Sequence, residues 1–199
     1  LFEGLTRFDA KGEAEAGLAQ NWQTSADGLI WTFTLRPGLT FSDGTPINAE
    51  VFAKAFTRSH DEKSGSPHGA LFGVIETIDA PNAQSVRIGL KNPFPQLPAL
   101  LAHPAMAALP FHRIEAAGDK WAADRPLVTS GAYRLTEWRL SQQLVLDANP
   151  RWHGGAPKTA RIYWKPMDNL YSAMRLVLAG GADIVGEYTP SRHHWLLQK

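Results

Sequence analysis

The stretch WTFTLRPGLTFSDGTPINAEVF, residues 31–52, contains the signals of a strand, two turns and the start of a helix. From Trp31 to Leu35 apolar and polar residues alternate, and this period of two is typical of a half-buried strand. Two pairs, Pro37-Gly38 and Asp43-Gly44, predict turns. Asn48 has the chemistry of a helix N-cap, so a helix is predicted over residues 49–58. Asp43 is therefore predicted to hold its turn by accepting hydrogen bonds from backbone amides, and not to act in catalysis.

The predicted helix has one apolar face, which indicates that it packs on a core. Val51, Phe52, Ala55 and Phe56 recur at helical spacing. Ile47 precedes the cap and stands at the distance from Phe52 that a hydrophobic staple requires.

The rest of the chain mixes strand and helix signals. The patterns predict strand–turn–strand over 74–94 with its bend at Pro81-Asn82, a buried helix or irregular core over 97–109, a weak helix over 112–124, a hairpin over 131–149, a strand over 160–167, an amphipathic helix over 170–181 and a short buried strand over 182–188. This mixture predicts an α/β or α+β fold and not a sandwich.

Composition excludes several classes of protein. The 199 residues carry a net charge of +1 with 44% hydrophobic residues, so a globular core is expected and an affinity for nucleic acid is not. There is no cysteine, which excludes disulfides, zinc–thiolate sites and a cysteine nucleophile. The longest apolar run, residues 97–111, is too short to span a bilayer. The chain starts at Leu1 without a signal pattern, so we expect either a mature form or a piece cut from something longer.

No catalytic or cofactor motif stands out. Ser130, in TSGAY, lacks the G-x-S-x-G elbow, and neither a P-loop nor a dinucleotide fingerprint is present, so no cofactor is predicted. Asp and Glu are too frequent for any pair to indicate glycoside hydrolysis. His193 and His194 are adjacent, which is poor geometry for two ligands of one metal, and we expect them exposed and unliganded.

Two other histidines leave alternatives open. His103 lies inside an apolar run and is either a core histidine bonded to backbone or part of a site. His68 lies in the SGSPHG loop, where it either contributes to recognition or is simply solvated. Most of the seven tryptophans are predicted to lie in the core, although aromatic pockets also hold peptides and sugars.

The order of the motifs resembles a known family nearly from end to end. The segments that carry the resemblance are LFEGLTRFD, LAQNW, DGLIWTFTLRPGLTFSDGTPINAEVF, LLAHPAMAALP, TSGAYRLTEW, LDANPRWHGGAP and the segment from Gly181 to Asp183. They are similar to family 5 of the bacterial extracytoplasmic solute-binding proteins, the oligopeptide- and dipeptide-binding components of ABC importers. The resemblance implies a binding protein and not an enzyme.

The resemblance also implies the architecture. The family fold is a clamshell of the type II periplasmic-binding-protein class with an additional α/β domain. Residues 3–110 would form the additional domain and residues 111–199 part of the first lobe, while the second lobe would be missing. We therefore predict that these 199 residues bind peptide weakly or not at all and self-associate to some degree. The implied location is periplasmic, or extracellular as a membrane-anchored lipoprotein, with a membrane permease as partner.

Four residues carry over as ligand-binding positions. The resemblance places His68 where oligopeptide binders offer an aromatic side chain to the peptide main chain, and His103 where a histidine approaches a peptide carboxylate. Gly186 and Glu187 stand where those binders have a tyrosine and an asparagine. Here a glycine would enlarge the side-chain pocket, and a carboxylate would favour a basic ligand.

Other functions stay open from the sequence. Within the family, the solute could be a nickel chelate, haem, an opine or an oligosaccharide. Outside it, the alternatives are a hydrolase, which needs a nucleophile and a base within hydrogen-bond reach, and a purely structural interaction domain.

Overall fold

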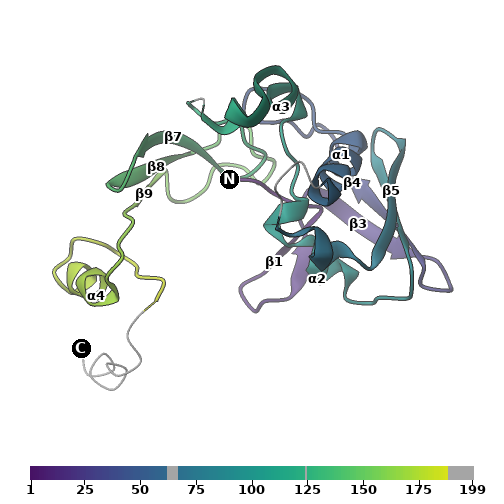
Figure 1. The fold of residues 1–199 in the computed structure, drawn as a ribbon, viewed down its shortest axis with the longest axis horizontal. Coiled ribbons are helices and arrows are strands. Elements are labelled where there is room, and N and C mark those ends of the chain that lie inside the picture. The colour runs from purple at the N-terminus through teal and green to yellow at the C-terminus, as the bar shows by residue number, and fades with distance from the viewer. Residues whose placement is uncertain (62–66, 124, 188–199) are drawn as a thin grey trace.

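A four-stranded antiparallel sheet is the largest sheet in the computed structural model, which describes residues 1–61, 67–123 and 125–187 (Figure 1). Its strands lie in the order β3-β4-β6-β5 and span Ala19–Thr24, Ile30–Leu35, Ser85–Leu90 and Ile75–Asn82. The central pair β4 and β6 registers Trp31 with Ile88 and Phe33 with Val86. All four of these side chains are buried, as the alternation in the sequence predicts.

Helix α1 (Ala49–His60) covers this sheet by packing on β5 and β6. Phe52 is 1% exposed and lies in the same hydrophobic cluster as Phe33, Val86 and Ile88. Ile47, just before the helix, is buried too, as the staple spacing predicts. The 3₁₀ turn η2 (Gly69–Phe72) follows α1 along the chain and adds the fully buried Phe72 to the core.

A short hairpin and a short helix close one side of this core. Strand β1 (Thr6–Phe8) pairs with β2 (Ala14–Ala16), and α2 (Leu97–Leu101) packs against β1. The hydroxyl of Thr6 donates a 2.6 Å hydrogen bond to the Pro98 carbonyl, which ties the hairpin to the helix. The 3₁₀ turn η3 (Pro104–Met106) follows α2 and contacts α1.

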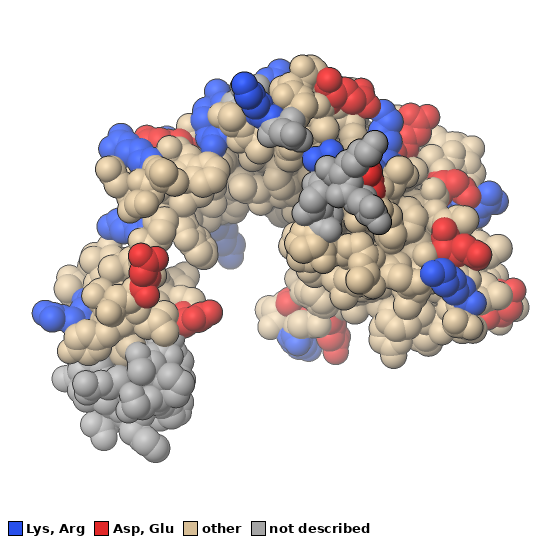
Figure 2. Space-filling model, viewed as in Figure 1, with Lys and Arg blue, Asp and Glu red and all other residues tan. Residues whose placement is uncertain are grey.

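A second body extends away from the first like an arm (Figure 1). Helix α3 (Phe111–Ala117) runs into the 3₁₀ turn η4 (Gly118–Ala123), and a three-stranded antiparallel sheet follows in the order β7-β8-β9. These strands span Tyr133–Arg139, Gln143–Ala148 and Arg161–Trp164. Helix α4 (Leu170–Leu178) lies at the far end, so the molecule has the outline of an arch with an open hollow beneath it (Figures 1 and 2).

Backbone hydrogen bonds join the two bodies. Ser42 donates from its amide to the Thr129 carbonyl at 2.9 Å, and the Thr129 amide donates back to the Ser42 hydroxyl at 3.0 Å. The Gly131 amide reaches the carbonyl of Leu1 at 2.8 Å. The FSDGTP turn and the first residues of the chain therefore lie against the irregular segment that leads into β7.

The local predictions are largely confirmed. The strand at β4, the helix at α1, the hairpins β5–β6 and β7–β8, strand β9 and helix α4 all lie where the patterns place them. The bend of β5–β6 lies at residues 83–84, however, and Pro81-Asn82 still belongs to β5. Residues 97–109 form α2 and η3 as irregular, mostly buried structure, and the weak helix after Phe111 is interrupted at Gly118, whose φ is +55°. The mixed class of strands and helices is confirmed, and every strand pair among the described residues is antiparallel.

Three predictions are wrong. Among the described tryptophans only Trp31 is buried, while Trp138 and Trp164 are exposed, so most of them do not lie in the core. Asn48 occupies the N-cap position of α1, but its side chain accepts no hydrogen bond from the helix. Residues 182–187 form no strand and are mostly exposed, with Ile184 at 84%, because none of the described strands lies beside them. Residue 188, the end of that predicted strand, lies outside the described residues, as do His193 and His194.

One face of the three-stranded sheet is apolar and exposed. Trp138, Leu144 and Trp164 are neighbours in one row across β7, β8 and β9, and the two tryptophans are 53% and 62% exposed. Charged residues elsewhere alternate in sign over the visible surface without forming a large patch (Figure 2). None of the described helices combines the length and the hydropathy that a membrane crossing requires.

Candidate ligand-binding site

The two histidines of the predicted site lie together in the fold. The ring centroids of His68 and His103 are 5.0 Å apart at an interplanar angle of 60°, an edge-to-face contact. The ring of Phe72 lies 5.9 Å from that of His103. His68 is exposed and His103 is half-buried, so this pair forms a small aromatic surface that is partly open to solvent.

The local structure explains why the two rings meet. His68 immediately precedes η2 and His103 immediately precedes η3, and both turns pack against α1. Pro104 at the first position of η3 cannot donate a backbone hydrogen bond, and the Nδ1 atom of His103 accepts the next free amide, that of Ala105, at 3.1 Å. The backbone bond predicted as the ordinary role of His103 is therefore present, and it leaves the Nε2 edge of the ring for another partner.

Gly186 and Glu187 lie elsewhere, at the end of the described chain beyond α4. Both are exposed, and a Cβ built on Gly186 meets no atom within 4 Å. Among the contacts between described residues, none connects either position to His68 or His103. The role predicted for these two residues stays a prediction.

The residues with the most distinctive electrostatics were missed by the sequence-based search. Glu3 is only 8% exposed, and its Oε2 accepts a 2.6 Å hydrogen bond from the Trp152 indole. The Nε2 atom of His153 lies 3.0 Å from the same oxygen, and the guanidinium of Arg7 lies 3.8 Å from Oε1. A glutamate inside the apolar motif LFEGL was the available signal.

The environment of Glu3 shifts its ionisation. Burial alone would raise the pKa of the Glu3 carboxyl, but hydrogen bonds from His153 and Trp152 and the charge of Arg7 outweigh burial and lower it. Glu3 is therefore held as a carboxylate in a largely buried place. It joins the first segment of the chain to the turn after β8, which is a structural task.

Candidate catalytic groups are engaged in structural hydrogen bonds. Ser130 is 2% exposed, and its hydroxyl donates a hydrogen bond to the Ala108 carbonyl at 2.8 Å and accepts one from the Glu3 amide at 3.0 Å. Asp43 Oδ1 accepts the Thr45 amide at 3.0 Å, as its turn chemistry predicts, and Oδ2 lies 2.8 Å from His112 Nε2. Burial would raise the pKa of Asp43, but the Thr45 and His112 bonds lower it.

A metal site and a surface depression are the two other kinds of site to consider in the described part of the chain. No group of three or more histidine and carboxylate side chains there has a geometry that could hold a metal ion. A surface depression of about 670 Å³ lies between α1 and β5, lined by Ser59, His60 and Lys91 among others, but neither His68 nor His103 lines it. The His68–His103 surface thus remains the candidate site.

A family model decides the identity of the fold. The model described as "Bacterial extracellular solute-binding proteins, family 5 Middle" matches residues 13–195, which is most of the chain. The chain belongs to this family. It is a family of solute-binding proteins and not of enzymes, as the sequence predicts.

Three family relatives show how far the similarity extends. The periplasmic oligopeptide-binding protein OppA of Salmonella typhimurium is 29% identical over 96% of this chain, which covers 38% of that protein. The periplasmic murein peptide-binding protein MppA of Escherichia coli is 30% identical over the whole chain, which covers 40% of it. A solved structure of MppA, described as an unliganded open form, superimposes with a TM-score of 0.93 at 29% identity and is covered to 42%.

The third relative has a different kind of ligand. The structure of MoaA from A. tumefaciens, in complex with mannopinic acid, matches 92% of this chain at 27% identity with a TM-score of 0.81, and 38% of MoaA is covered. The chain therefore spans about two fifths of the length of the relatives that it matches.

Proposed function

We propose that the protein containing this chain is the extracytoplasmic solute-binding component of an ABC importer and that it captures short peptides. The observation that carries this proposal is the similarity of the whole chain to the oligopeptide- and murein peptide-binding relatives in both sequence and fold. Delivery would be to a permease in the membrane, and the location would be periplasmic, as the names of those relatives state.

The proposed architecture follows the family. Residues 3–110 would be the additional α/β domain, and residues 111–199 would be part of the first lobe of a type II clamshell. The separation into two bodies joined near Ser42 and Thr129 supports a division close to this boundary. Ligand would bind between lobes that close on it, which requires a higher affinity in the closed state.

The four ligand-binding positions are part of the proposal. His68 and His103 form an aromatic and hydrogen-bonding surface that suits a peptide main chain, and their contact at 5.0 Å supports a shared role. Gly186 would leave room for a large side chain, and Glu187 would favour a basic one. The exposure of Glu187 is compatible with a residue that meets its partner only on ligand binding.

Native mass spectrometry of the complete protein, purified without refolding, tests the peptide assignment. Release of a series of small peptide masses on activation supports it, and the masses give the preferred length. A single non-peptide mass would instead support the second candidate, a small non-peptide solute, which the likeness to the mannopinic acid complex of MoaA favours.

A titration with charged peptides tests Glu187. Lysine-containing tripeptides should bind more weakly to Glu187→Gln than to the wild type, while acidic tripeptides should not. Equal affinities of both proteins for both peptide classes would exclude a charge-selective role for this carboxylate.

A further inference from the structure

We propose that the surface depression between α1, η2 and β5 is a second ligand site and that it binds a free α-amino acid with an apolar side chain. Neither His68 nor His103 lines the depression, so it is distinct from the candidate site described above. The inference goes beyond the proposed function, because such a site would exist whether or not the protein carries peptides.

The size and the walls of the depression suit a small organic molecule. Its volume of about 670 Å³ lies within the range of roughly 300–1,000 Å³ that is common for small-molecule sites. The side chains of Phe56, Ala70 and Ile75 line it, and the ring of His60 packs against that of Phe56 with the centroids 4.2 Å apart. An aliphatic or aromatic side chain of a ligand would bury apolar area against these walls.

A β-bulge in β5 brings a carboxylate to the same wall. The pairing of β5 with β6 shifts its register between Ile75 and Thr77, so Glu76 is the extra residue. Consecutive side chains of a regular strand point to opposite faces, but here both Ile75 and Glu76 line the depression. The bulge therefore places a charged group beside an apolar wall.

Lys91 supplies the opposite charge from the end of the neighbouring strand. It follows β6 directly, and its amide donates a 3.0 Å hydrogen bond to the Val74 carbonyl, which fixes the Lys91 backbone beside β5. Within the described part of the chain, neither the Lys91 ammonium nor the Glu76 carboxylate makes a hydrogen bond or an ion pair. Both residues are exposed, so both charges are available to a ligand.

The end of α1 adds negative charge to the depression. Ser59 and His60 belong to the last turn of α1 and line the depression, as does Asp61 just beyond the helix. A helix carries a partial negative charge at its C-terminal end, which attracts a cationic group. The ammonium of a ligand is therefore expected to pair with Glu76 and the end of α1, and its carboxylate to pair with Lys91.

This set of charges favours a zwitterion over a ligand that carries one charge. An anion would meet the carboxylates of Glu76 and Asp61, and a cation without a carboxylate would leave Lys91 unpaired. An α-amino acid carries both charges on one carbon atom, and its side chain can lie against Phe56. A free amino acid with an apolar side chain therefore matches both the charges and the walls.

Binding of three related probes to the complete protein tests the charge assignment. L-Phenylalanine carries both charges, phenethylamine lacks the carboxylate, and hydrocinnamate lacks the ammonium. In titrations followed by saturation-transfer NMR, we expect L-phenylalanine to bind about 2- to 5-fold more tightly than either analogue, which is the contribution of one exposed ion pair. Lys91→Gln should abolish the advantage over phenethylamine only, and Glu76→Gln the advantage over hydrocinnamate only.

Matched variants locate the site. Lys11→Gln and Glu13→Gln change exposed charges in the turn between β1 and β2 and should leave the affinities for all three probes unchanged. Ala70→Trp places a large side chain at an exposed wall of the depression and should abolish binding, with circular dichroism to check that the variant is folded. If Ala70→Trp does not fold, the variants at the exposed Lys91 and Glu76 decide.

Four results would overturn the proposal. The wild type could bind no L-phenylalanine at millimolar concentrations, or it could bind the two analogues as tightly as L-phenylalanine. Lys91→Gln and Glu76→Gln could keep the preferences of the wild type, so that neither charge contacts the ligand. Binding that survives in a folded Ala70→Trp variant would place L-phenylalanine outside the depression.

Discussion

Removing the Glu3 carboxylate should destabilise the fold more than removing the carboxylate of Glu13 or of Asp43. Glu3→Ala leaves the Trp152 indole N–H, now at 2.6 Å, and His153, now at 3.0 Å, without their acceptor. A hydrogen bond to a charged group contributes about 1.5–3 kcal/mol, and the two bonds share one oxygen, so they do not add fully. Relief of the carboxylate's own burial offsets part of the loss. We expect the free energy of unfolding to fall by about 3 kcal/mol.

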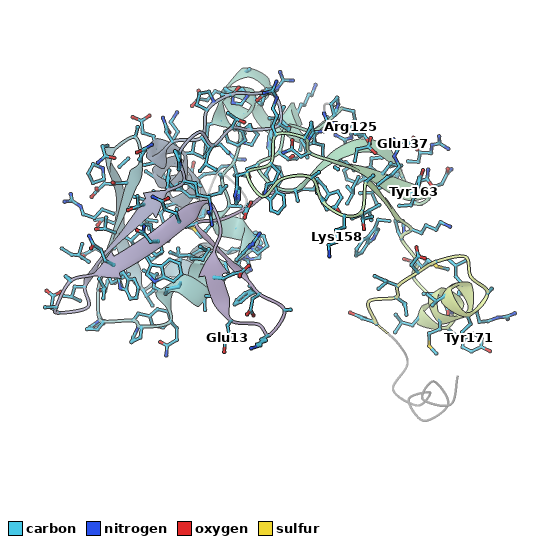
Figure 3. The ribbon with its side chains drawn as sticks, turned by 180° about the vertical axis from the view of Figure 1, so that it is seen from behind. Glu13, Arg125, Glu137, Lys158, Tyr163 and Tyr171 are labelled. Carbon is cyan, nitrogen blue, oxygen red and sulfur yellow. The ribbon has the colours of Figure 1, made fainter. Side chains whose placement is uncertain are left out.

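Urea unfolding followed by far-ultraviolet circular dichroism measures this loss without relying on Trp152 fluorescence. Glu13→Ala is the matched control, because Glu13 lies exposed in the turn between β1 and β2 and projects from it (Figure 3). The control should change the unfolding free energy by less than about 0.5 kcal/mol. Glu3→Gln, which keeps one acceptor oxygen but loses the charge, should fall between the two.

The effect should depend on pH in a defined direction. The folded protein lowers the pKa of Glu3 through its hydrogen bonds and the charge of Arg7, so the carboxylate stabilises the fold above the unfolded pKa of about 4.3. This contribution is lost as the pH falls through the lower, folded pKa. The stability difference between wild type and Glu3→Gln should therefore shrink below about pH 4.

Two results would refute this reasoning. The first is a loss in Glu3→Ala no larger than that in Glu13→Ala, which would mean that the buried contacts contribute nothing net. The second is a difference between wild type and Glu3→Gln that stays constant from pH 7 to pH 3, since the charge would then not matter.

Three further predictions concern the turn, the junction and the exposed sheet. Asp43→Asn should lower the unfolding free energy by about 0.5–1 kcal/mol at neutral pH and by less below about pH 4, because the pKa of Asp43 is lowered in the fold; urea titrations at several pH values check this. Gly131→Ala should destabilise by about 1–3 kcal/mol in thermal and urea unfolding, since its Cβ would lie 2.8 Å from a backbone oxygen, whereas Gly186→Ala, with open space around it, should not. The 199-residue chain should self-associate in sedimentation velocity, and replacing Trp138 and Trp164 with serine should reduce this; equal sedimentation of both proteins would contradict an apolar contact through this face.

Further aromatic side chains are exposed on the arm. Tyr163 on β9 and Tyr171 on α4 lie there (Figure 3), at 57% and 50% exposure. Tyr163 precedes Trp164 on β9 and therefore lies on the opposite face of the sheet, so the expected contact depends on the row formed by Trp138, Leu144 and Trp164.

The sequence predicted those elements whose signals are local. The strand, turns and helix of residues 31–52 could be predicted because alternation, turn pairs and helical spacing depend on neighbours within a few residues. Asp43 was correctly interpreted as a turn residue for the same reason, since the Thr45 amide lies two residues away. The order of such motifs was also sufficient to indicate the family.

Patterns that needed a distant partner were less reliable. Residues 182–187 have the apolar composition of a buried strand, but a strand exists only when another strand pairs with it, and none of the described strands does. Asn48 has cap chemistry, but whether its side chain turns toward the helix depends on packing that the sequence does not display.

The sequence by itself determined the elements, the family and the candidate histidines, because each depends on nearby residues or on motif order. Only the tertiary structure placed His68 against His103. It alone brought Glu3 to Trp152 and His153, with sequence separations of 149 and 150. Contacts at such distances arise from how whole elements pack, and local patterns along a chain carry no record of that packing.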